Sequence, residues 1–379
     1  MRILMLDNEF PPLGGGTGVV NYHLLQEFAG YPDVSVDLVT SSRSAKSFET
    51  EQFASRIMIY KVPVDNRNIH HSTNRELIRY AWRGLRQCQK LLQEYTYNIS
   101  FALAGVPAGV MSCTLKLRYG LPYLVSLQGP DVPGFEARYR NLYLILKPIL
   151  RQVWRQAAVV TAISHEHQRL AYETLDDIEI PIIYNGVNTE IFCPGNHKHE
   201  SINILCVGRL IERKGQHHLL RAFASLSQEL PDYHLQLTLA GTGDAESALK
   251  TLAERLGITD QVHFAGFIPH QTMPEIYRQA DIFVLPSQSE GMSMALLEAL
   301  ASGLPVVVTD TGGTRELVST GANGLVVVWA DVEGLVRALK QLVKDISLRE
   351  KMGFAARQVA LMFSWAQIAR QYLDLISSL

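Results

Sequence analysis

The chain has 379 residues with 47% hydrophobic content, which is enough for two or three domains with substantial cores. Its 35 basic and 37 acidic residues give a formal net charge of −2, which argues against a dedicated nucleic-acid-binding protein. The four cysteines are widely spaced and form no C-x-x-C pair, so neither a disulfide framework nor a zinc site is expected.

The sequence shows no pattern of a targeting segment or a membrane-spanning helix. The apolar start of the chain is interrupted at Asp7, unlike the apolar core of a signal peptide. No apolar run approaches the ~20 residues that a membrane-spanning helix requires. We therefore expect a cytoplasmic protein, for which any contact with a membrane is peripheral and at its inner face.

Short apolar runs alternate with helical stretches along the first half of the chain. The first run, residues 2–8, is followed by a glycine-rich turn and an amphipathic stretch at 19–29. This repeated order predicts a parallel sheet with helices on both faces, where ligands bind beyond the carboxyl ends of the strands. Further strands of this half are predicted at 34–40, 57–62, 99–103, 123–127, 159–162 and 182–184.

The turn after the first strand, residues 10–16, reads FPPLGGG. Its glycines Gly15 and Gly16 would let the backbone approach a ligand closely. A dinucleotide site would also need an acid at the end of the second strand, but that strand ends in Thr40 and is followed by Ser41. A nicotinamide cofactor is therefore not expected, and the turn by itself is a weak signal.

A polar loop follows the predicted strand 123–127 and contains Gln128 and Asp131. Both side chains can hydrogen-bond to a hydroxyl of a ligand. A purely structural role for Gln128 stays open as an alternative.

The stretch 138–157 combines arginine and lysine with tyrosine and tryptophan. It belongs to a locally basic region, residues 67–155, which has thirteen basic and four acidic residues. This mixture suits an anionic membrane surface or a lipid-linked acceptor, although its aliphatic residues could also be ordinary core. Pro148 predicts a kink or a division into two segments.

The periodic pattern is lost at residues 189–201, which contain polar and helix-breaking residues and are interpreted as a linker. The alternation then begins again, which predicts two similar domains, 1–188 and 202–362. The tail, 363–379, is predicted to be a helix with one apolar face. Strands of the second domain are predicted at 202–208, 235–240, 262–264, 282–285, 306–309 and 325–328.

Two cations follow directly after the first strand of the second domain. Arg209 and Lys214 lie in the segment GRLIERKG, at the strand end where a ligand would bind. The fork of an arginine and the point charge of a lysine can together neutralise a diphosphate. From the residues alone, both could equally be solvent-facing loop residues.

The stretch 281–308 predicts a strand, a turn, a helix over 292–302 and another strand. Glu290 precedes this helix and Glu298 lies two turns along it, so both carboxylates face roughly the same side. Carboxylates accept hydrogen bonds from pairs of sugar or ribose hydroxyls, and the N–H groups that begin the helix form an anion site. The alternative is that Glu290 caps the helix and Glu298 is solvated.

The two glutamates belong to a longer pattern, E-G followed by six residues and E-A, and then A-S-G-x-P-V-V. It resembles the donor-site signature of the retaining glycosyltransferases of family 4 (glycosyl transferases group 1). The acids and their spacing match, but Met292 and Ser293 stand where the family commonly has an aromatic residue and a glycine. The glycine turn also resembles a family segment, as does Asn185-Gly186-Val187 with Phe192, so the resemblance covers nearly the whole chain.

The resemblance implies the GT-B fold, in which two Rossmann-like domains with doubly wound parallel sheets face a central cleft. It also implies that the last helix crosses back to the first domain. The reaction would move a sugar from a nucleotide-diphosphate-sugar to an acceptor hydroxyl with retention of configuration, in cell-surface glycan or glycoconjugate synthesis. The acceptor would be a glycan, a lipid-linked molecule or a small molecule.

In the resembled family, the second domain holds the donor and the first holds the acceptor. Glu298 would take the ribose hydroxyls, Glu290 the transferred sugar, and Arg209 with Lys214 the diphosphate. The implied catalytic residues are Glu290, Gln128, Lys214 and Arg209. The other implied donor contacts are Gly15, Gly16, Ile268, Gly291, Met292, Ser293 and Met294, and the implied acceptor contacts are Gly15, Gly16, Gln128 and Asp131.

Most members of the family have a histidine where this chain has Gln128. Glutamine cannot transfer protons near neutral pH, so only hydrogen bonding or electrostatic stabilisation is expected from it. The implied mechanism is a front-face reaction in which the leaving phosphate helps to deprotonate the acceptor. Protein cations would replace a metal, and no D-x-D segment suggests one, so neither a metal nor a cofactor is expected.

Two alternatives stay open from the sequence. Some nucleotide-sugar epimerases share the two-domain architecture, and such an enzyme would convert its substrate without an acceptor. A decayed nucleotide-sugar-binding protein would bind the nucleotide without turnover, and Gln128 is the hint in its favour. The intact pairs of glutamates and cations weigh against decay.

Overall fold

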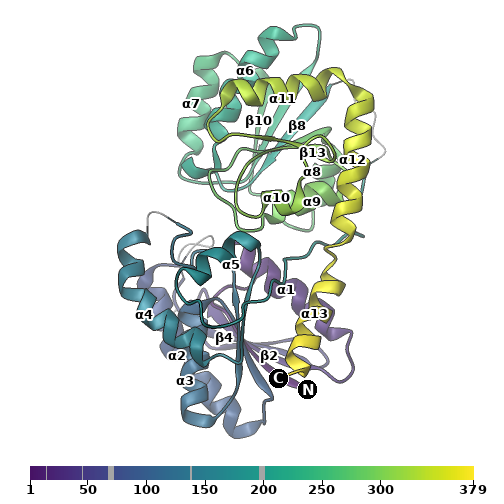
Figure 1. The fold of residues 1–379 in the computed structure, drawn as a ribbon. Helices are drawn as coiled ribbons and strands as arrows, with labels where there is room; N and C mark the ends of the chain where they lie inside the picture. Colours follow the sequence, from purple (N-terminus) through teal and green to yellow (C-terminus); the bar gives the residue numbers. More distant parts are fainter. Residues whose placement is uncertain (14, 45, 67–71, 137–138, 196–200) are drawn as a thin grey trace. The chain divides into compact units, whose positions relative to one another are not determined.

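The computed structural model describes residues 1–13, 15–44, 46–66, 72–136, 139–195 and 201–379. The chain divides into two compact units. Unit 1 consists of Met1–Asn185 and Trp365–Leu379, and unit 2 consists of Gly186–Ser364. Each unit has a largely parallel sheet with helices packed on it (Figure 1).

The sheet of unit 1 has seven strands in the order β3-β4-β2-β1-β5-β6-β7. All neighbours pair in parallel except β3 and β4, which are antiparallel. Its inner strands are buried on both faces, which explains their nearly continuous apolar sequences. The strands are β1 (Arg2–Leu6), β2 (Ser35–Ser42), β3 (Glu49–Ala54), β4 (Ile57–Pro63), β5 (Ile99–Leu103), β6 (Tyr123–Leu127) and β7 (Val159–Ala162).

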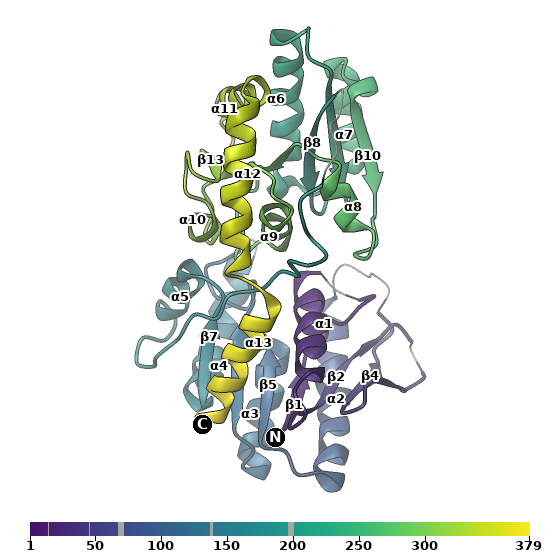
Figure 2. The same ribbon diagram turned by 90° about the vertical axis from the view of Figure 1, so that its right-hand side faces the viewer.

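The helices of unit 1 cover both faces of this sheet, and the C-terminal helix α13 lies beside α1 (Figure 2). On this face Trp365 stacks on His23 with ring centroids 5.2 Å apart, and Tyr372 contacts Phe101 at 4.9 Å. The helices are α1 (Gly16–Ala29), α2 (Asn74–Glu94), α3 (Val110–Tyr119), α4 (Arg140–Gln156), α5 (His165–Tyr172) and α13 (Trp365–Ser377), with a π-helical turn at Gly105–Gly109.

The sheet of unit 2 has six parallel strands in the order β10-β9-β8-β11-β12-β13. Its main core contains residues of both the strands and the covering helices. The strands are β8 (Ile202–Val207), β9 (Leu235–Ala240), β10 (Val262–Gly266), β11 (Ile282–Leu285), β12 (Val306–Thr309) and β13 (Gly324–Val327).

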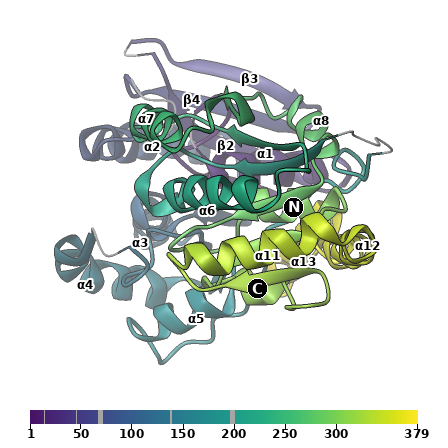
Figure 3. The same ribbon diagram turned by 90° about the horizontal axis from the view of Figure 1, so that it is seen from above.

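Helices of unit 2 pack in pairs, with α11 beside α6 (Figure 3) and α12 against α9. The helices are α6 (Gln216–Glu229), α7 (Glu246–Leu256), α8 (Met273–Arg278), α9 (Met294–Ala301), α10 (Thr314–Leu317), α11 (Val332–Lys344) and α12 (Ile346–Leu361), with 3-10 turns at Glu212–Lys214 and Thr259–Gln261.

The predicted fold class, two α/β domains with parallel sheets, is confirmed. The strand predicted at 182–184 is wrong, because this segment forms only an isolated bridge between Ile182 and Ala162. Pro181 has no N–H to extend a ladder. The antiparallel edge strand β3 was not predicted, and α1 begins at Gly16 rather than at residue 19.

The helix predicted at 138–157 is present as α4, which continues through Pro148, so of the two predicted effects of this proline the division into two segments is wrong. Tyr143 and Trp154 are buried, and the Tyr143 hydroxyl donates to the Pro130 carbonyl oxygen at 2.9 Å. These two aromatic rings therefore belong to the core and not to a surface. Arg138, Gly14 and residues 196–200 of the predicted linker lie outside the described residues.

Candidate functional site

In unit 2, the predicted donor residues lie in loops that flank the centre of the sheet. β8 lies between β9 and β11, and the chain runs from β8 to β9 on one side and from β11 to β12 on the other. The loops after β8 and β11 therefore leave the sheet in opposite directions, which creates the kind of crevice where open α/β sheets bind ligands. The first loop contains Arg209 and Lys214, and the second contains Glu290 and Gly291.

Glycines let these loops pack backbone against backbone. A Cβ atom on Gly215, whose φ is +70°, would lie 2.0 Å from the carbonyl oxygen of Pro286. A Cβ atom on Gly313, in the loop after β12, would lie 2.0 Å from the carbonyl oxygen of Gly291. Side chains at these positions would push apart the loops after β8, β11 and β12. The glycines therefore allow these three loops to pack closely at the candidate site.

Lys214 and Glu290 form an ion pair between the two loops. Lys214 Nζ lies 2.5 Å from Glu290 Oε1, and their side chains are only 13% and 11% exposed. Burial favours a higher pKa for Glu290, but the charge and hydrogen bond of Lys214, with a further contribution from Arg213, hold that pKa below its ordinary value. Glu290 is therefore an ionised carboxylate at neutral pH.

Two arginines accompany this pair. Arg213 donates from Nη1 to the carbonyl oxygen of Ser289 at 3.2 Å, and its own carbonyl oxygen accepts from the Gln288 N–H at 2.8 Å. Arg209 is half-buried, and its carbonyl oxygen accepts from Gln216 Nε2 at 3.0 Å. The sequence reasoning missed Arg213, for which the adjacent Lys214 was the available signal.

Glu298 lies on α9 and is buried, with 6% exposure. Its Oε2 accepts from the Tyr277 hydroxyl at 2.8 Å, and its Oε1 lies 3.4 Å from His270 Nε2. His270 and the half-buried Ile268 belong to the same loop after β10, so the structure brings this loop to Glu298. Tyr277 and His270 were missed by the sequence reasoning, since neither belongs to a motif that it considered.

The helix that follows Glu290 begins two residues later than predicted, at Met294. Ser293 is its N-cap, and the Ser293 hydroxyl accepts from the Leu296 N–H at 3.4 Å. The first amides without intrahelical partners are consequently those of Met294 and Ala295. Met292 is buried, with 7% exposure.

In unit 1, Gly15 and Gly16 are exposed at the turn between β1 and α1. The Gly15 N–H donates to Glu9 Oε2 at 2.9 Å. A Cβ atom on either glycine would meet no described atom within 4 Å, so contacts in unit 1 do not require glycine here. Near Glu9 lies Asp7, whose pKa is raised well above its ordinary value by burial and by the charge of Glu9. The sequence reasoning missed this pair of acids.

Asp131 organises the loop after β6. Its Oδ2 accepts from the Gly105 N–H at 2.8 Å, and its Oδ1 accepts from the Gly129 N–H, also at 2.8 Å. Burial raises the pKa of Asp131, while these backbone bonds oppose the rise. Both carboxylate oxygens thus have structural partners, and a contact with an acceptor stays a prediction.

Gln128 is linked to the C-terminal helix through a buried hydroxyl. Its Nε2 donates to Ser126 Oγ at 2.8 Å, and Ser126 Oγ lies 2.8 Å from the Tyr372 hydroxyl on α13. With its amide nitrogen used in this way, Gln128 has its carbonyl oxygen left to accept a hydrogen bond from a ligand.

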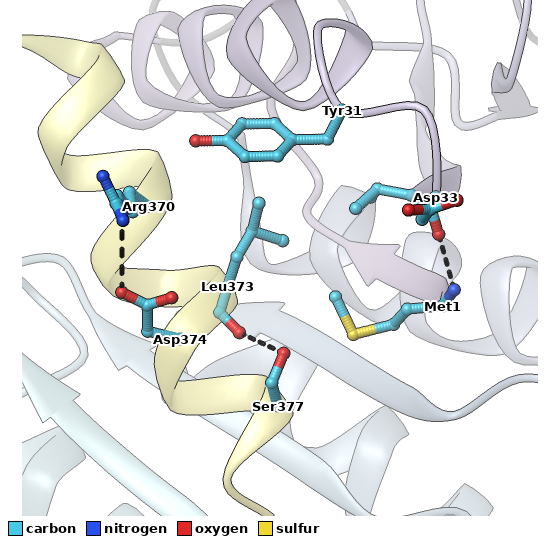
Figure 4. A pocket seen from close by; sticks show the side chains of 8 residues that line it. Met1, Tyr31, Asp33, Arg370, Leu373, Asp374 and Ser377 are labelled. Carbon is cyan, nitrogen blue, oxygen red and sulfur yellow. Dashed lines mark hydrogen bonds and ion pairs between the residues drawn. The ribbon is translucent and has the colours of Figure 1, made fainter.

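A surface pocket of about 420 Å³ lies elsewhere in unit 1, between the start of β1, the segment after α1 and helix α13 (Figure 4). Its polar groups bond to one another: the Met1 amino group donates to the Asp33 carbonyl oxygen at 2.6 Å, and Arg370 Nε lies 3.9 Å from Asp374 Oδ2. Met1 precedes the amino end of β1, whereas the glycine turn follows its carboxyl end. The pocket is therefore separate from the candidate site.

Within the described ranges, no group of three or more His, Cys, Asp or Glu side chains is arranged to hold a metal ion. In the same part of the chain, no helix is both long and apolar enough to cross a membrane.

Comparison with known families gives a match in each half of the chain. The family model described as Glycosyltransferase Family 4 matches residues 14–191, and the model described as Glycosyl transferases group 1 matches residues 187–359.

Curated relatives span nearly the whole chain. An uncharacterized glycosyltransferase of Methanocaldococcus jannaschii is 31% identical over 99% of this chain and 97% of its own length. The GDP-mannose-dependent alpha-(1-6)-phosphatidylinositol monomannoside mannosyltransferase of Mycolicibacterium smegmatis is 26% identical over 99% of this chain and 98% of its own length.

Among solved structures, sucrose-phosphate synthase from Thermosynechococcus elongatus superimposes with a TM-score of 0.87 at 20% identity, over 100% of this chain and 98% of that chain. This likeness establishes the fold. Together with the family matches and the full-length relatives, it shows that the chain belongs to the glycosyltransferases of family 4 (glycosyl transferases group 1) and has the GT-B fold.

Proposed function

We propose that this glycosyltransferase moves a sugar from a nucleotide-diphosphate-sugar to an acceptor hydroxyl, with retention of configuration and without a metal ion. The observation that carries the proposal is the Lys214–Glu290 pair in the loops after β8 and β11. A cation and an ionised carboxylate at this crevice match a donor that has both an anionic diphosphate and sugar hydroxyls.

In the proposed donor complex, Lys214 and Arg209 neutralise the diphosphate and so take the place of a metal. Glu290 accepts hydrogen bonds from the transferred sugar, and the amides around Gly291, Met292, Ser293 and Met294 donate to the same region. Glu298 binds the ribose hydroxyls, and the loop with Ile268 contacts the base.

Gly15, Gly16, Gln128 and Asp131 are proposed to contact the acceptor, with the glycine turn also approaching the donor phosphate. Gln128 does not move a proton but accepts a hydrogen bond and stabilises the reacting face. The bond from the anomeric carbon to the phosphate oxygen breaks as the bond to the acceptor oxygen forms on the same face. The acceptor proton passes to the leaving phosphate, which balances the reaction without a protein base.

The name of the M. smegmatis relative supports a nucleotide-sugar donor and a lipid acceptor for that protein. By extension, we propose a glycan, lipid-linked or small-molecule acceptor in cell-surface glycan synthesis, no cofactor, and a site of action in the cytoplasm at the inner face of the membrane.

Helix α4 provides the surface for this peripheral contact. Leu142, Ile145 and Ile149 recur at spacings of three and four residues and are 37%, 69% and 43% exposed, beside Leu144 at 72%. Arg140 at the start of the helix is also exposed. An exposed apolar face with basic residues fits an anionic lipid surface better than water.

Replacing Leu144 and Ile145 together with serine should lower the partition coefficient onto vesicles of phosphatidylcholine and phosphatidylglycerol by about tenfold or more, because apolar side chains no longer insert. Co-sedimentation measures this change. Phe354→Ser is the matched control, since Phe354 is 70% exposed on α12 of unit 2. Equal binding by both variants and the unaltered protein would exclude α4 as the lipid contact.

The proposed function is tested first by thermal shift of the pure protein with UDP, GDP and ADP and with their sugars. A ligand at ~100-fold excess over its dissociation constant should add about 2.7 kcal/mol to the free energy of unfolding. Any stabilising sugar nucleotide is then incubated with and without a chelator, and released sugar is measured.

Stabilisation by one nucleotide family, followed by slow release of sugar that resists the chelator, would support the proposal. Stabilisation by none of these ligands would overturn the donor site, and release that stops with the chelator would overturn the metal-free mechanism.

A further inference from the structure

Behind Glu298 lies a cluster of three rings, Tyr277, Phe192 and His270, to which the proposed function assigns no role. Tyr277 is completely buried, and Phe192 is 1% exposed. The Phe192 ring meets Tyr277 edge-on at 5.6 Å and His270 at 5.5 Å between centroids. All three residues belong to unit 2, so the cluster is internal to the unit that contains the predicted donor residues.

The Tyr277 hydroxyl faces two acceptors. Glu298 Oε2 lies at 2.8 Å and the Ala295 carbonyl oxygen at 3.1 Å. A hydroxyl has one proton to donate, and the shorter contact to the charged oxygen is the stronger one. The proton of Tyr277 is thus directed at Glu298 and restrains the position of Oε2.

The Tyr277 ring is itself held in place by the start of unit 2. Phe192 packs against it from the segment that follows Asn185-Gly186-Val187. Arg357 anchors this segment by donating to the carbonyl oxygens of Phe192 and Thr189, each at 2.8 Å. The ring therefore cannot turn away from Glu298 without disturbing a packed and hydrogen-bonded segment.

We propose that Tyr277 is a positioning residue that orients Glu298 toward the nucleotide, and so makes the protein prefer ribose to deoxyribose. Tyr277 holds Oε2, and Oε1 lies 3.4 Å from His270 Nε2 of the β10 loop, on the side where the proposed complex places the nucleotide. A carboxylate fixed in one orientation accepts hydroxyl hydrogen bonds with less loss of side-chain entropy than one that rotates. The inference rests on the proposed function, in which Glu298 binds the ribose.

Tyr277→Phe tests the inference, because it removes one oxygen and keeps the packed ring. Dissociation constants for UDP, GDP and their 2′,3′-dideoxy counterparts are measured by calorimetry for the unaltered protein, Tyr277→Phe, Glu298→Gln and the double variant. Tyr80→Phe is the matched control, since Tyr80 is also fully buried and donates to the Val39 carbonyl oxygen at 2.9 Å in unit 1.

The unaltered protein should bind the ribonucleotide about tenfold or more tightly than the dideoxynucleotide, as expected for hydrogen bonds to a charged group. In Tyr277→Phe, the ratio of the dideoxynucleotide to the ribonucleotide dissociation constant should fall close to one, and the KM for the donor should rise at nearly unchanged kcat. In Tyr80→Phe, this ratio and the KM should equal those of the unaltered protein. In the Glu298→Gln background, Tyr277→Phe should have no further effect on the ratio.

If Tyr277→Phe kept the preference of the unaltered protein for the ribonucleotide while Glu298→Gln lost it, this inference would be overturned and the proposed function would stand. If the unaltered protein showed no preference for the ribonucleotide, or if Glu298→Gln kept that preference, the ribose role of Glu298 would be overturned, and this inference with it.

Discussion

The Glu290→Ala variant is expected to lose turnover by about a thousandfold or more, because an electrostatic contact to the reacting sugar is usually among the largest single contributions to catalysis. Nucleotide binding should stay within a few fold, since in the proposed complex the diphosphate is held by Lys214 and Arg209. Turnover is measured as sugar transfer or release. Binding is measured as the dissociation constant of the nucleoside diphosphate that the thermal-shift screen identifies.

Gln288→Ala provides the control for Glu290→Ala. Gln288 lies two residues earlier in the same loop and is exposed, so this variant reports any general effect of shortening a side chain there. If Glu290→Ala retained full turnover, Glu290 would not be the contact to the transferred sugar.

Lys214→Ala should weaken binding of the nucleoside diphosphate by about a hundredfold, because it removes the cation proposed to face the phosphates. It should also lower the free energy of unfolding of unit 2, since Glu290 is left without its cation at 11% exposure. Breaking a buried pair in this way costs about 3–5 kcal/mol, and the lower end is expected because both side chains remain partly exposed to water. Isothermal calorimetry measures the first effect and denaturant unfolding the second.

A double variant, Lys214→Met with Glu290→Gln, separates the two effects of Lys214. It removes both charges, so stability should return toward that of the unaltered protein while diphosphate binding stays weak. Lys250→Ala is the control, because Lys250 forms a surface pair with Glu246 at 2.7 Å with side chains 52% and 30% exposed, and such pairs contribute less than about 1 kcal/mol. Unchanged diphosphate affinity in Lys214→Ala would exclude Lys214 as a phosphate ligand.

Most strands of both sheets were predictable because burial on two faces leaves a continuous apolar signal, as at Ile282–Leu285 and Val306–Thr309. β3 gave no such signal, since its sequence ETEQFA lies at a sheet edge with most side chains exposed. Proline was misjudged in two opposite ways. A division at Pro148 was one of two predicted effects, but α4 continues through it, whereas the missing N–H of Pro181 was overlooked.

The family resemblance suggested the proposed donor-site residues, but the sequence did not show what surrounds them. Lys214 and Glu290 are 76 residues apart, and only the folded sheet brings their loops into contact. The start of α9 was predicted at Met292 but lies at Met294, with the Ser293 hydroxyl as its cap, because a helix start depends on local backbone geometry that periodicity does not resolve. The contact between Tyr277 and Glu298 could not be predicted from the sequence, because the two residues lie on different helices that only the fold brings together.

The return of α13 to unit 1 has a consequence for synthesis on the ribosome. Unit 2 is a continuous segment, Gly186–Ser364, inserted into unit 1, whereas unit 1 needs two stretches that are translated far apart in time. Tyr372 of α13 contacts Phe101 on β5 and Ser126 on β6. These two side chains lack this contact until α13 has emerged from the ribosome. Unit 2 can therefore complete its fold before unit 1, which lacks its last helix throughout that interval.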